Sequence, residues 1–303
     1  MSTPAVSILM PVYNAAQFLR LAVASMQAQT FRDFELIAID DGSTDNSKAI
    51  LDRIAAADTR IRVISRPNTG IVGALNDGLA VARGEFIARM DADDVALPTR
   101  IATQLDYLRQ HPDCIALGTS VQIVDSRSAV VDRYDPPTSH DAIMAELLSG
   151  NGGAIIHPTV IFRATALRTV NGYDPAFGKA EDLDLYLRLS PHGQFSNLPV
   201  LGLQYRHHVK STNFKHRQTQ LGLIARILER ERSRRNLSPL PANQSGHSDL
   251  SPGLLHARWA CSALTHGTRL TAIRHGLCSV MKEPRETECW RSLRYVLTAR
   301  RPG

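Results

Sequence analysis

Residues 86 to 94 read FIARMDADD, a mainly apolar run of extended pattern that leads directly into three carboxylates. The run predicts a buried strand, and Leu97-Pro98 predicts a helix soon after it, because the first helical turn does not use the N–H that proline lacks. Three acids at the end of a buried strand repel one another, whereas a divalent cation facing a phosphate would reverse that penalty. Asp91, Asp93 and Asp94 therefore indicate either a solvated acidic turn or a cation site.

Before this stretch, strands and helices alternate with short connections. The sequence predicts strands at 6–11, 34–39 and 61–64, and helices at about 17–29, 43–57 and 71–83. This alternation is typical of an α/β fold with a mostly parallel sheet flanked by helices. Such sheets bind ligands beyond the carboxyl ends of their strands. Pro11, Asp40, Asp41 and the acids at 91–94 are therefore expected to share one edge of the sheet.

The pattern is less regular after residue 110. The sequence predicts short strands at 115–118, 121–124 and 130–134, extended chain at 157–162, a strand pair that ends near 205, and helices at 140–148 and 181–189. From residue 216 the periodicity is helical, with helices at 254–265, 269–281 and 286–299 and a linker rich in Pro, Ser and Gly at 237–252. We therefore expect a first domain at 1–215 and a helical extension at 216–303.

The net charge of +6 on these 303 residues is unevenly distributed. Residues 1–215 hold 20 Lys/Arg and 23 Asp/Glu, whereas residues 216–303 hold 15 and 6, a balance of +9. The four cysteines lack the spacing of a zinc site or a disulfide framework. No apolar run approaches the ~20 residues of a membrane span, and no signal peptide precedes Val6, so the sequence predicts a cytoplasmic protein.

Five segments, taken in order, resemble the inverting glycosyltransferases of family 2, which have the GT-A fold. They read VSILMPVYN at 6–14, DDGSTD at 40–45, DADD at 91–94, ED at 181–182 and YRHH at 205–208. The resemblance covers about residues 4 to 212. It implies a GT-A fold, Rossmann-like with a mostly parallel sheet flanked by helices, to which this chain adds a C-terminal helical extension.

The resemblance also implies a pocket for a nucleotide-diphosphate sugar. Pro11, Tyr13 and Asn14 would belong to this pocket, and Asp40 or Asp41 would accept a hydrogen bond from a base N–H. Uracil and thymine offer such a donor, so the resemblance favours a UDP- or dTDP-sugar. Alternatively, the aspartate pair is only part of the turn and caps the next helix. A third possibility is that one aspartate binds the base and the other caps the helix.

The remaining acids receive roles in the same way. The resemblance implies that Asp91 holds the ribose, and that Asp93 binds Mg²⁺ or Mn²⁺ next to the diphosphate. His208 lies where the family often places a histidine near the metal, although His207 beside it leaves the register open. Asp94 either supports the metal ligands from behind or starts the next helix.

Inversion in a single displacement needs a base that takes the proton of the acceptor hydroxyl. The resemblance implies Asp182 as this base, with Glu181 orienting the acceptor and His157 on the acceptor side. Alternatively, Glu181 and Asp182 are present only because the helix dipole favours acids in a first helical turn. His157 could equally be a core histidine. The acceptor class implied is a glycan or a lipid-linked saccharide.

Other enzyme classes fit the sequence less well. Processive relatives carry Gln-x-x-Arg-Trp, but Leu255 takes the place of the glutamine before Arg258-Trp259. A sugar-phosphate nucleotidyltransferase would have a glycine-rich loop after the first strand, where the sequence reads VYNAA. A nucleotide-sugar-binding scaffold without turnover is the non-enzymatic alternative, and the presence of all the acids argues against it.

The basic C-terminal helices admit two interpretations. They could lie on an anionic membrane surface at the inner face of the membrane, with Trp290, Leu293 and Leu297 on the apolar side. Alternatively their apolar stripes pack on the rest of the protein and the arginines are solvated. Nucleic acid is not expected as a partner, because the basic residues are not interleaved with aromatic ones.

Overall fold

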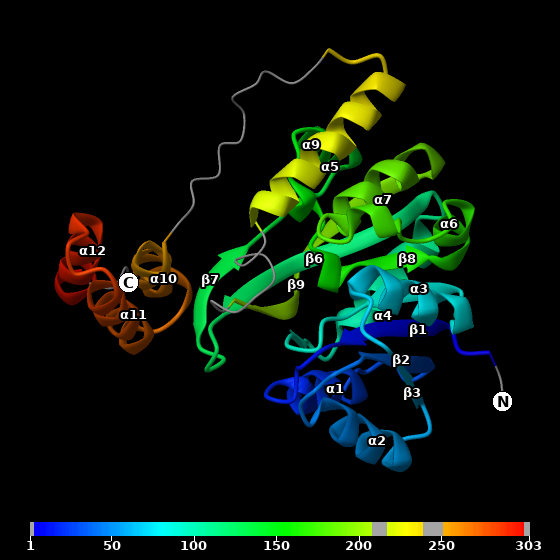
Figure 1. The fold of residues 1–303 in the computed structure, drawn as a ribbon, viewed down its shortest axis with the longest axis horizontal. Coiled ribbons are helices and arrows are strands. Elements are labelled where there is room, and N and C mark those ends of the chain that lie inside the picture. The colour runs from blue at the N-terminus through cyan, green and yellow to red at the C-terminus, as the bar shows by residue number, and fades with distance from the viewer. Residues whose placement is uncertain (1–2, 208–216, 239–250, 300–303) are drawn as a thin grey trace. The chain divides into compact units, whose positions relative to one another are not determined.

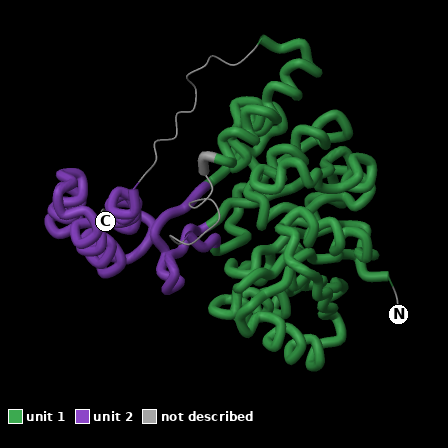
Figure 2. Tube along the Cα trace, viewed as in Figure 1, with its two compact units in different colours: residues 1–121, 135–204, 216–238 green, residues 122–134, 205–215, 239–303 purple. Residues whose placement is uncertain are grey.

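The computed structural model describes residues 3–207, 217–238 and 251–299. Contacts between residues divide the chain into two compact units (Figure 2). Unit 1 comprises residues 1–121, 135–204 and 216–238, and unit 2 comprises residues 122–134, 205–215 and 239–303. The sequence predicted one boundary, at residue 215, with one continuous domain on each side of it. Each compact unit instead consists of three separate segments of the chain. The predicted domains therefore stay a prediction.

The first half of unit 1 is the parallel part of the sheet (Figure 1). Its strands lie in the order β3-β2-β1-β4 and all pair in parallel. Helices α1 and α2 cover one face and α3 covers the other, which is the arrangement that right-handed crossovers produce. The strands are β1 Val6–Val12, β2 Phe34–Asp41, β3 Ile61–Arg66 and β4 Phe86–Arg89, and the helices are α1 Leu19–Gln27, α2 Ser47–Ala57 and α3 Ile71–Val81.

The rest of the sheet is largely antiparallel and continues from β4 in the order β8-β6-β9-β5, with β7 paired to β6. Three expectations are corrected here. The strands predicted at 115–118 and 121–124 are one strand, β6, the strand pair before residue 205 is the single strand β9, and residues 157–159 form a 3₁₀ turn before β8. The strands are β5 Val95–Ala96, β6 Cys114–Val124, β7 Val130–Tyr134, β8 Ile161–Arg163 and β9 Gln194–Arg206.

The core of unit 1 follows from its sequence. Every residue of β2 is buried, and β1 is buried except for the half-buried Pro11, as expected for strands covered on both faces. The remaining helices of unit 1 pack around this sheet. They are α4 Arg100–Gln110, α5 His140–Leu148, α6 Ala164–Thr169, α7 Glu181–Leu189 and α9 Arg217–Arg234. The α/β class, the sheet flanked by helices and the C-terminal helices are confirmed.

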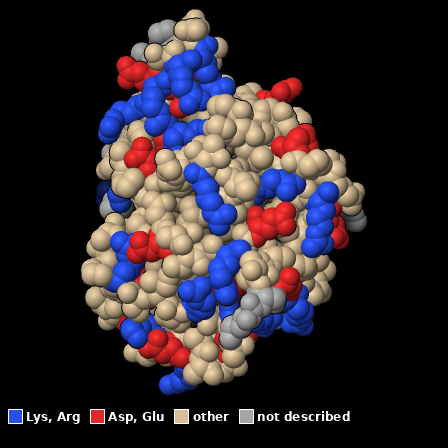
Figure 3. Space-filling view, turned by 90° about the vertical axis from the view of Figure 1, so that its right-hand side faces the viewer, with Lys and Arg blue, Asp and Glu red and all other residues tan. Residues whose placement is uncertain are grey.

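Helix α9 shows what the arginines of the extension do in unit 1. Arg230 donates a hydrogen bond of 2.7 Å to Asp184, a fully buried carboxylate of α7, and lies over the Phe177 ring. Figure 3 shows Lys and Arg gathered over α9 at the top of that view, and interspersed with acidic groups elsewhere on the same face. Part of the basic charge is therefore used to neutralise buried acids.

Unit 2 is a helical bundle packed on β7. Its helices are α10 Pro252–His266, α11 Arg269–Lys282 and α12 Thr287–Thr298. A small apolar core joins them, made of Ala260, Ala263, Ala272, Leu293 and Val296. None of the described helices is both long enough and apolar enough to span a membrane.

A series of hydrogen-bonded side chains connects the β6–β7 turn to this bundle. Asp125 accepts from His275 Nε2 at 3.1 Å and pairs with Arg274. The Nδ1 atoms of His275 and His256 lie 2.8 Å apart, so one ring nitrogen donates to the other. Burial and the neighbouring His275 lower the pKa of His256 to about 4.

We expect acid to loosen unit 2 because His256 is held neutral in the folded protein. Its pKa in the unfolded chain is about 6.5, so the unfolded chain binds the extra proton between pH 6.5 and 4 and stability falls across that window. Because His256 is partly exposed, we expect a loss of only about 1 kcal/mol. Hydrogen exchange of the α10 and α11 amides at pH 7.5 and 5.0 measures it. His256→Gln should reduce the pH dependence, whereas the control His266→Gln should not; equal behaviour of the two variants would contradict this account.

Candidate active site

The strand register brings the predicted residues to one edge of the sheet. Val12 of β1 is paired with Asp40, and Asp41 is paired with Arg66 at the end of β3. On the other side of β1, the last pair with β4 is Leu9 and Arg89. The segments after β1, β2 and β4 therefore begin side by side, as the alternation of strands and helices predicted.

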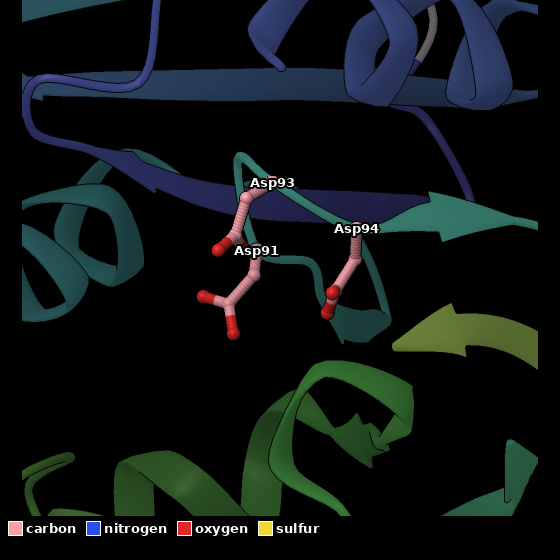
Figure 4. A group of neighbouring side chains, drawn as sticks. All are labelled: Asp91, Asp93 and Asp94. Carbon is pink, nitrogen blue, oxygen red and sulfur yellow. The ribbon is translucent and has the colours of Figure 1, made fainter. Parts of the chain in front are cut away.

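The acidic turn after β4 is compact. Asp91, Asp93 and Asp94 each place a carboxylate oxygen within 4.8 Å of the others (Figure 4). Arg89, which is itself buried, forms an ion pair with Asp91. Burial raises the pKa of Asp91, and the Arg89 charge only partly offsets this rise. The neighbouring charges of Asp93 and Asp182 raise it further.

Asp94 differs from the other two acids because it is fully buried. The buried Arg100 is close enough for the Asp94 charge to act on it, and burial lowers the pKa of Arg100 to about 9 even though Asp94 opposes this. Arg100 also donates to the Arg89 carbonyl at 2.8 Å. Asp94 is therefore placed to neutralise the arginine that supports the turn.

The second acidic pair begins α7. Glu181 and Asp182 are the first two residues of this helix, where the dipole favours carboxylates. Burial raises the pKa of both, and for Glu181 the charge of Asp182 adds to the rise. Asp182 also raises the pKa of Asp91, so the α7 acids and the acidic turn share one electrostatic environment.

The Asp182 side chain faces a glycine. A Cβ added to Gly152 would lie 3.4 Å from Asp182 Oδ2, and Oδ1 accepts from the Leu183 N–H at 2.7 Å. Gly152 begins the 3₁₀ turn Gly152–Ala154 that follows α5. A Cβ at this distance would make ordinary van der Waals contact with the carboxylate, so Gly152 lies directly beside the Asp182 oxygens.

His157 lies close enough to Arg89 for the arginine charge to act on it. It is buried, and its Nε2 lies 2.9 Å from the hydroxyl of Tyr173. Burial and the Arg89 charge keep the pKa of His157 well below its usual range, so the ring is neutral. His157 is thus a buried histidine beside Tyr173, and its predicted place on the acceptor side stays a prediction.

The two aspartates that end β2 have different partners. Asp41 accepts from the backbone N–H groups of Thr69 and Gly70 at 3.1 and 2.9 Å and pairs with Arg66. Asp40 accepts from the Ser43 N–H at 3.2 Å. Both carboxylates order loops at the edge of the sheet. Each oxygen has a further lone pair, so either could still accept from a ligand.

Asn14 connects the loops after β1 and β2. Its φ is +50°, and its Oδ1 accepts from the Thr44 N–H at 2.8 Å and from the Asp45 N–H at 3.3 Å. Its own N–H donates to Ser43 Oγ at 3.1 Å. Tyr13 next to it is 53% exposed, so its ring is available to a ligand. Asn14 therefore joins the two loops, and the nucleotide pocket predicted beside them stays a prediction.

We expect Asn14→Ala to loosen this edge. The variant loses the Oδ1 acceptor and strains a residue at positive φ, which together lower the free energy of unfolding by about 1–3 kcal/mol. Asn14→Gly removes the same acceptor without the strain, so it separates the two effects. Urea unfolding of both variants measures them. If Asn14→Ala matches the parent, the loops are held by other contacts.

His208 lies outside the described residues. Its neighbour His207 belongs to unit 2, where its ring contacts Tyr205 and Trp259, with centroid distances of 5.0 and 6.4 Å. The role predicted for His208 at the metal stays a prediction.

Sequence reasoning missed three residues. Arg89 was counted within an apolar strand, although a lone arginine in a buried strand indicates a nearby acidic partner, here Asp91. Arg66 and Tyr173 gave no local signal, because their partners Asp41 and His157 lie 25 and 16 residues before them in the chain. These residues neutralise or orient the predicted ones.

The residues of the acidic turn fit a divalent cation. Clustered carboxylate oxygens are the ligands that Mg²⁺ and Mn²⁺ prefer, and Arg89 only partly offsets the effects that raise the pKa of Asp91. Asp91 and Asp93 are partly exposed and could reach such an ion, whereas Asp94 is buried.

Comparisons with known proteins identify the family. A family model described as glycosyl transferase family 2 matches residues 7–170. The Bacillus subtilis protein EpsE, assigned by its name to the glycosyltransferases, is 32% identical over 243 residues, which are 79% of this chain and 85% of EpsE. The O-antigen biosynthesis glycosyltransferase WbnJ of Escherichia coli is 31% identical over 211 residues, which are 68% of this chain and 81% of WbnJ.

Solved structures share the fold. TarS 1–349 of S. aureus in complex with UDP-GlcNAc has a TM-score of 0.58 and 16% identity, covering 96% of this chain and 90% of that chain. The mannosyltransferase PcManGT from Pyrobaculum calidifontis, in complex with GDP-Man and Mn²⁺, has a TM-score of 0.55 and 18% identity, covering 98% and 86%. The fold and the site together define a glycosyltransferase of the GT-A type. The chain belongs to glycosyl transferase family 2.

Proposed function

We propose that this glycosyltransferase is metal-dependent and inverting. It would move one sugar from a nucleotide-diphosphate donor to a hydroxyl of a glycan or a lipid-linked acceptor during polysaccharide biosynthesis. One observation carries the proposal: the acidic turn after β4 and Asp182 of α7 are close enough for the Asp182 charge to raise the pKa of Asp91. The similarity to WbnJ, named for O-antigen biosynthesis, supports the polysaccharide context.

The donor would bind along the edge formed by β1, β2 and β4. Pro11 and the exposed Tyr13 would contact the base, Asp40 or Asp41 would accept its N–H, and Asp91 would hold the ribose. A UDP- or dTDP-sugar offers this N–H. The UDP-GlcNAc bound to TarS is in line with this donor class, whereas PcManGT holds GDP-Man, so the base must be tested.

The reaction would be a single displacement. Asp182 takes the proton from the acceptor hydroxyl as that oxygen forms a bond to the anomeric carbon from the face opposite the diphosphate. The bond between the anomeric carbon and the diphosphate oxygen breaks, and its electron pair leaves with the diphosphate. Asp93, with His208 as a further candidate ligand, would hold a divalent cation, which when bound would supply positive charge to the leaving diphosphate.

The surrounding residues would keep these acids in position. Arg89 orients Asp91 through their ion pair, and Glu181 next to Asp182 would orient the acceptor. The buried His157 forms a hydrogen bond with the Tyr173 hydroxyl. The raised pKa of Asp182 makes it a better proton acceptor than a solvated aspartate would be.

A two-part experiment tests this function. Thermal unfolding is measured with UDP-, dTDP- and GDP-sugars, each with and without Mn²⁺, because a ligand of the native state raises the melting temperature. The stabilising donor is then incubated with candidate acceptors, and NMR reads the anomeric configuration of the product. We expect a UDP- or dTDP-sugar to raise the melting temperature only when Mn²⁺ is present. We also expect the anomeric configuration of the product to be inverted relative to the donor. Retention of configuration would rule out the proposed role of Asp182.

The acceptor would be met in the cytoplasm. A lipid-linked acceptor would be presented at the inner face of the membrane, so the enzyme would work at a membrane surface without a spanning helix of its own among the described residues. A soluble glycan acceptor would make no such demand.

A further inference from the structure

Helices α11 and α12 of unit 2 expose large apolar side chains at regular spacing. On α11, Leu270, Leu277 and Met281 are 79%, 49% and 81% exposed, and on α12, Trp290 and Leu297 are 53% and 49% exposed. Intervals of seven and four residues place the side chains of each helix on one face. Single exposed apolar residues are ordinary, but two ordered rows on neighbouring helices indicate an interaction surface.

These rows are separate from the faces that build the bundle. Ala272 and Gly276 of α11 and Leu293 and Val296 of α12 are buried between the helices. The sequence grouped Leu293 with Trp290 and Leu297, but in the structure Leu293 points into the core while the other two are exposed. Each helix therefore has a second apolar face that the bundle leaves uncovered.

The two rows run along the same hairpin. Trp290 Nε1 donates to the carbonyl of Pro284 in the turn that follows Met281, at 2.9 Å. At the other end, Arg269 donates to the Leu297 carbonyl at 2.8 Å. Met281 and Trp290 thus flank the turn, whereas Leu270 and Leu297 lie toward the opposite end. We name these five residues, Leu270, Leu277, Met281, Trp290 and Leu297, the hairpin face.

Positive charge predominates along the hairpin as a whole, although its three acids, Glu283, Glu286 and Glu288, lie in or beside the turn. Residues 269–298 contain six Lys/Arg and three Glu, a balance of +3. Five of the six cations are exposed, and Arg294 lies between Trp290 and Leu297 at helical spacing. The exposed cations are Arg269, Lys282, Arg285, Arg291 and Arg294. Long basic side chains can keep their charge in water while their stems lie along an apolar surface.

We propose that the hairpin face docks on an anionic phospholipid membrane. The exposed Leu, Met and Trp side chains would enter the boundary between headgroups and acyl chains, as interfacial amphipathic helices do. The flanking cations would meet the headgroup phosphates, because basic side chains near an anionic surface are attracted to it. Trp290 suits this depth because its large ring is apolar and its N–H is already satisfied by the Pro284 carbonyl. This docking goes beyond the transfer reaction and does not depend on it.

Binding to vesicles tests the proposal directly with the full chain. Co-sedimentation compares vesicles of phosphatidylcholine alone with vesicles that contain about 30% phosphatidylglycerol, at low and high salt. We expect binding to the anionic vesicles that weakens as salt rises. Leu277→Ser combined with Met281→Ser should weaken it by at least about 10-fold, because each residue loses more than 1 kcal/mol of burial. The control Leu21→Ser, at an exposed leucine on α1 of unit 1, should bind like the parent.

Tryptophan fluorescence gives a second, independent measurement. The chain has two tryptophans, Trp290 on the hairpin face and the buried Trp259. Anionic vesicles should shift the emission of the parent to shorter wavelength, and Trp290→Phe should abolish the shift while leaving sedimentation nearly unchanged. An emission that does not shift at saturating lipid would overturn the proposal, as would equal binding of the Leu277/Met281 variant and the parent. Dimerisation seen by analytical ultracentrifugation without vesicle binding would assign the face to a second copy of the chain.

Discussion

Asp182→Asn is expected to lower kcat by about 10²- to 10⁴-fold, which is the usual contribution of a positioned general base. The amide cannot take the proton of the acceptor hydroxyl, but it fills the same space beside Gly152 and can still accept from the Leu183 N–H. Donor affinity should therefore change little. Release of the nucleoside diphosphate measures the rate, and calorimetry measures donor binding.

The same substitution should raise the melting temperature. Burial raises the pKa of Asp182, so its charged form is disfavoured in the folded protein and a neutral amide is tolerated better. A gain of stability with a loss of turnover separates a catalytic role from misfolding. Glu181→Gln, the neighbouring substitution, should cost less activity. An Asp182→Asn protein with full transfer activity would remove the proposed mechanism.

The acid limb of the activity profile should reflect this carboxylate as well. Its raised pKa means that protonation of the base begins at a higher pH than for a solvated aspartate, so kcat should fall earlier on the acid side. The variant, which has no such proton, should show a flatter acid limb. Initial rates between pH 4.5 and 8 at saturating donor would show the difference.

Features of the fold and the site could be predicted from the sequence when they depend on residues close together in the chain. The edge that carries Asp40, Asp41 and Asp91 followed from alternating strands and helices, because parallel strands with short crossovers align their carboxyl ends. The electrostatic interaction between Asp182 of α7 and Asp91 of the turn after β4 joins residues about ninety positions apart. No periodicity predicts it, and only the resemblance to family 2 placed Asp182 near the donor.

The errors in the second half of the sheet have a specific cause. Thr119 and Ser120 interrupt the apolar pattern, so the sequence suggested two short strands where β6 continues through them. Both residues are buried, and the Thr119 N–H donates to Thr159 Oγ1 at 3.2 Å. Its partner lies forty residues away in the chain. A buried polar pair of this kind is ordinary inside a folded protein and cannot be recognised from one strand alone.

Asp93→Ala is expected to abolish the metal dependence of donor binding. Asp93 contributes an oxygen to the compact acidic turn, and Asp91 is already held by Arg89, so without Asp93 the remaining ligands would bind a divalent cation weakly. Because the metal supplies several kcal/mol of stabilisation to the leaving diphosphate, kcat/KM should fall by about 10³-fold. Calorimetry with donor, with and without Mn²⁺, should give the same weak affinity for the variant in both conditions.

Two further substitutions distinguish a metal ligand from a general loss of charge. Asp113→Ala, at an exposed acid before β6, should keep the metal dependence of the parent. Asp94→Ala should instead lower stability, because it leaves the buried Arg100 without its acidic neighbour. If Asp93→Ala still binds donor more tightly with Mn²⁺ than without, the ion is held elsewhere and the leaving group is stabilised by other residues. If only Asp93→Ala loses the Mn²⁺ effect while its melting temperature matches the parent, the turn after β4 is the metal site.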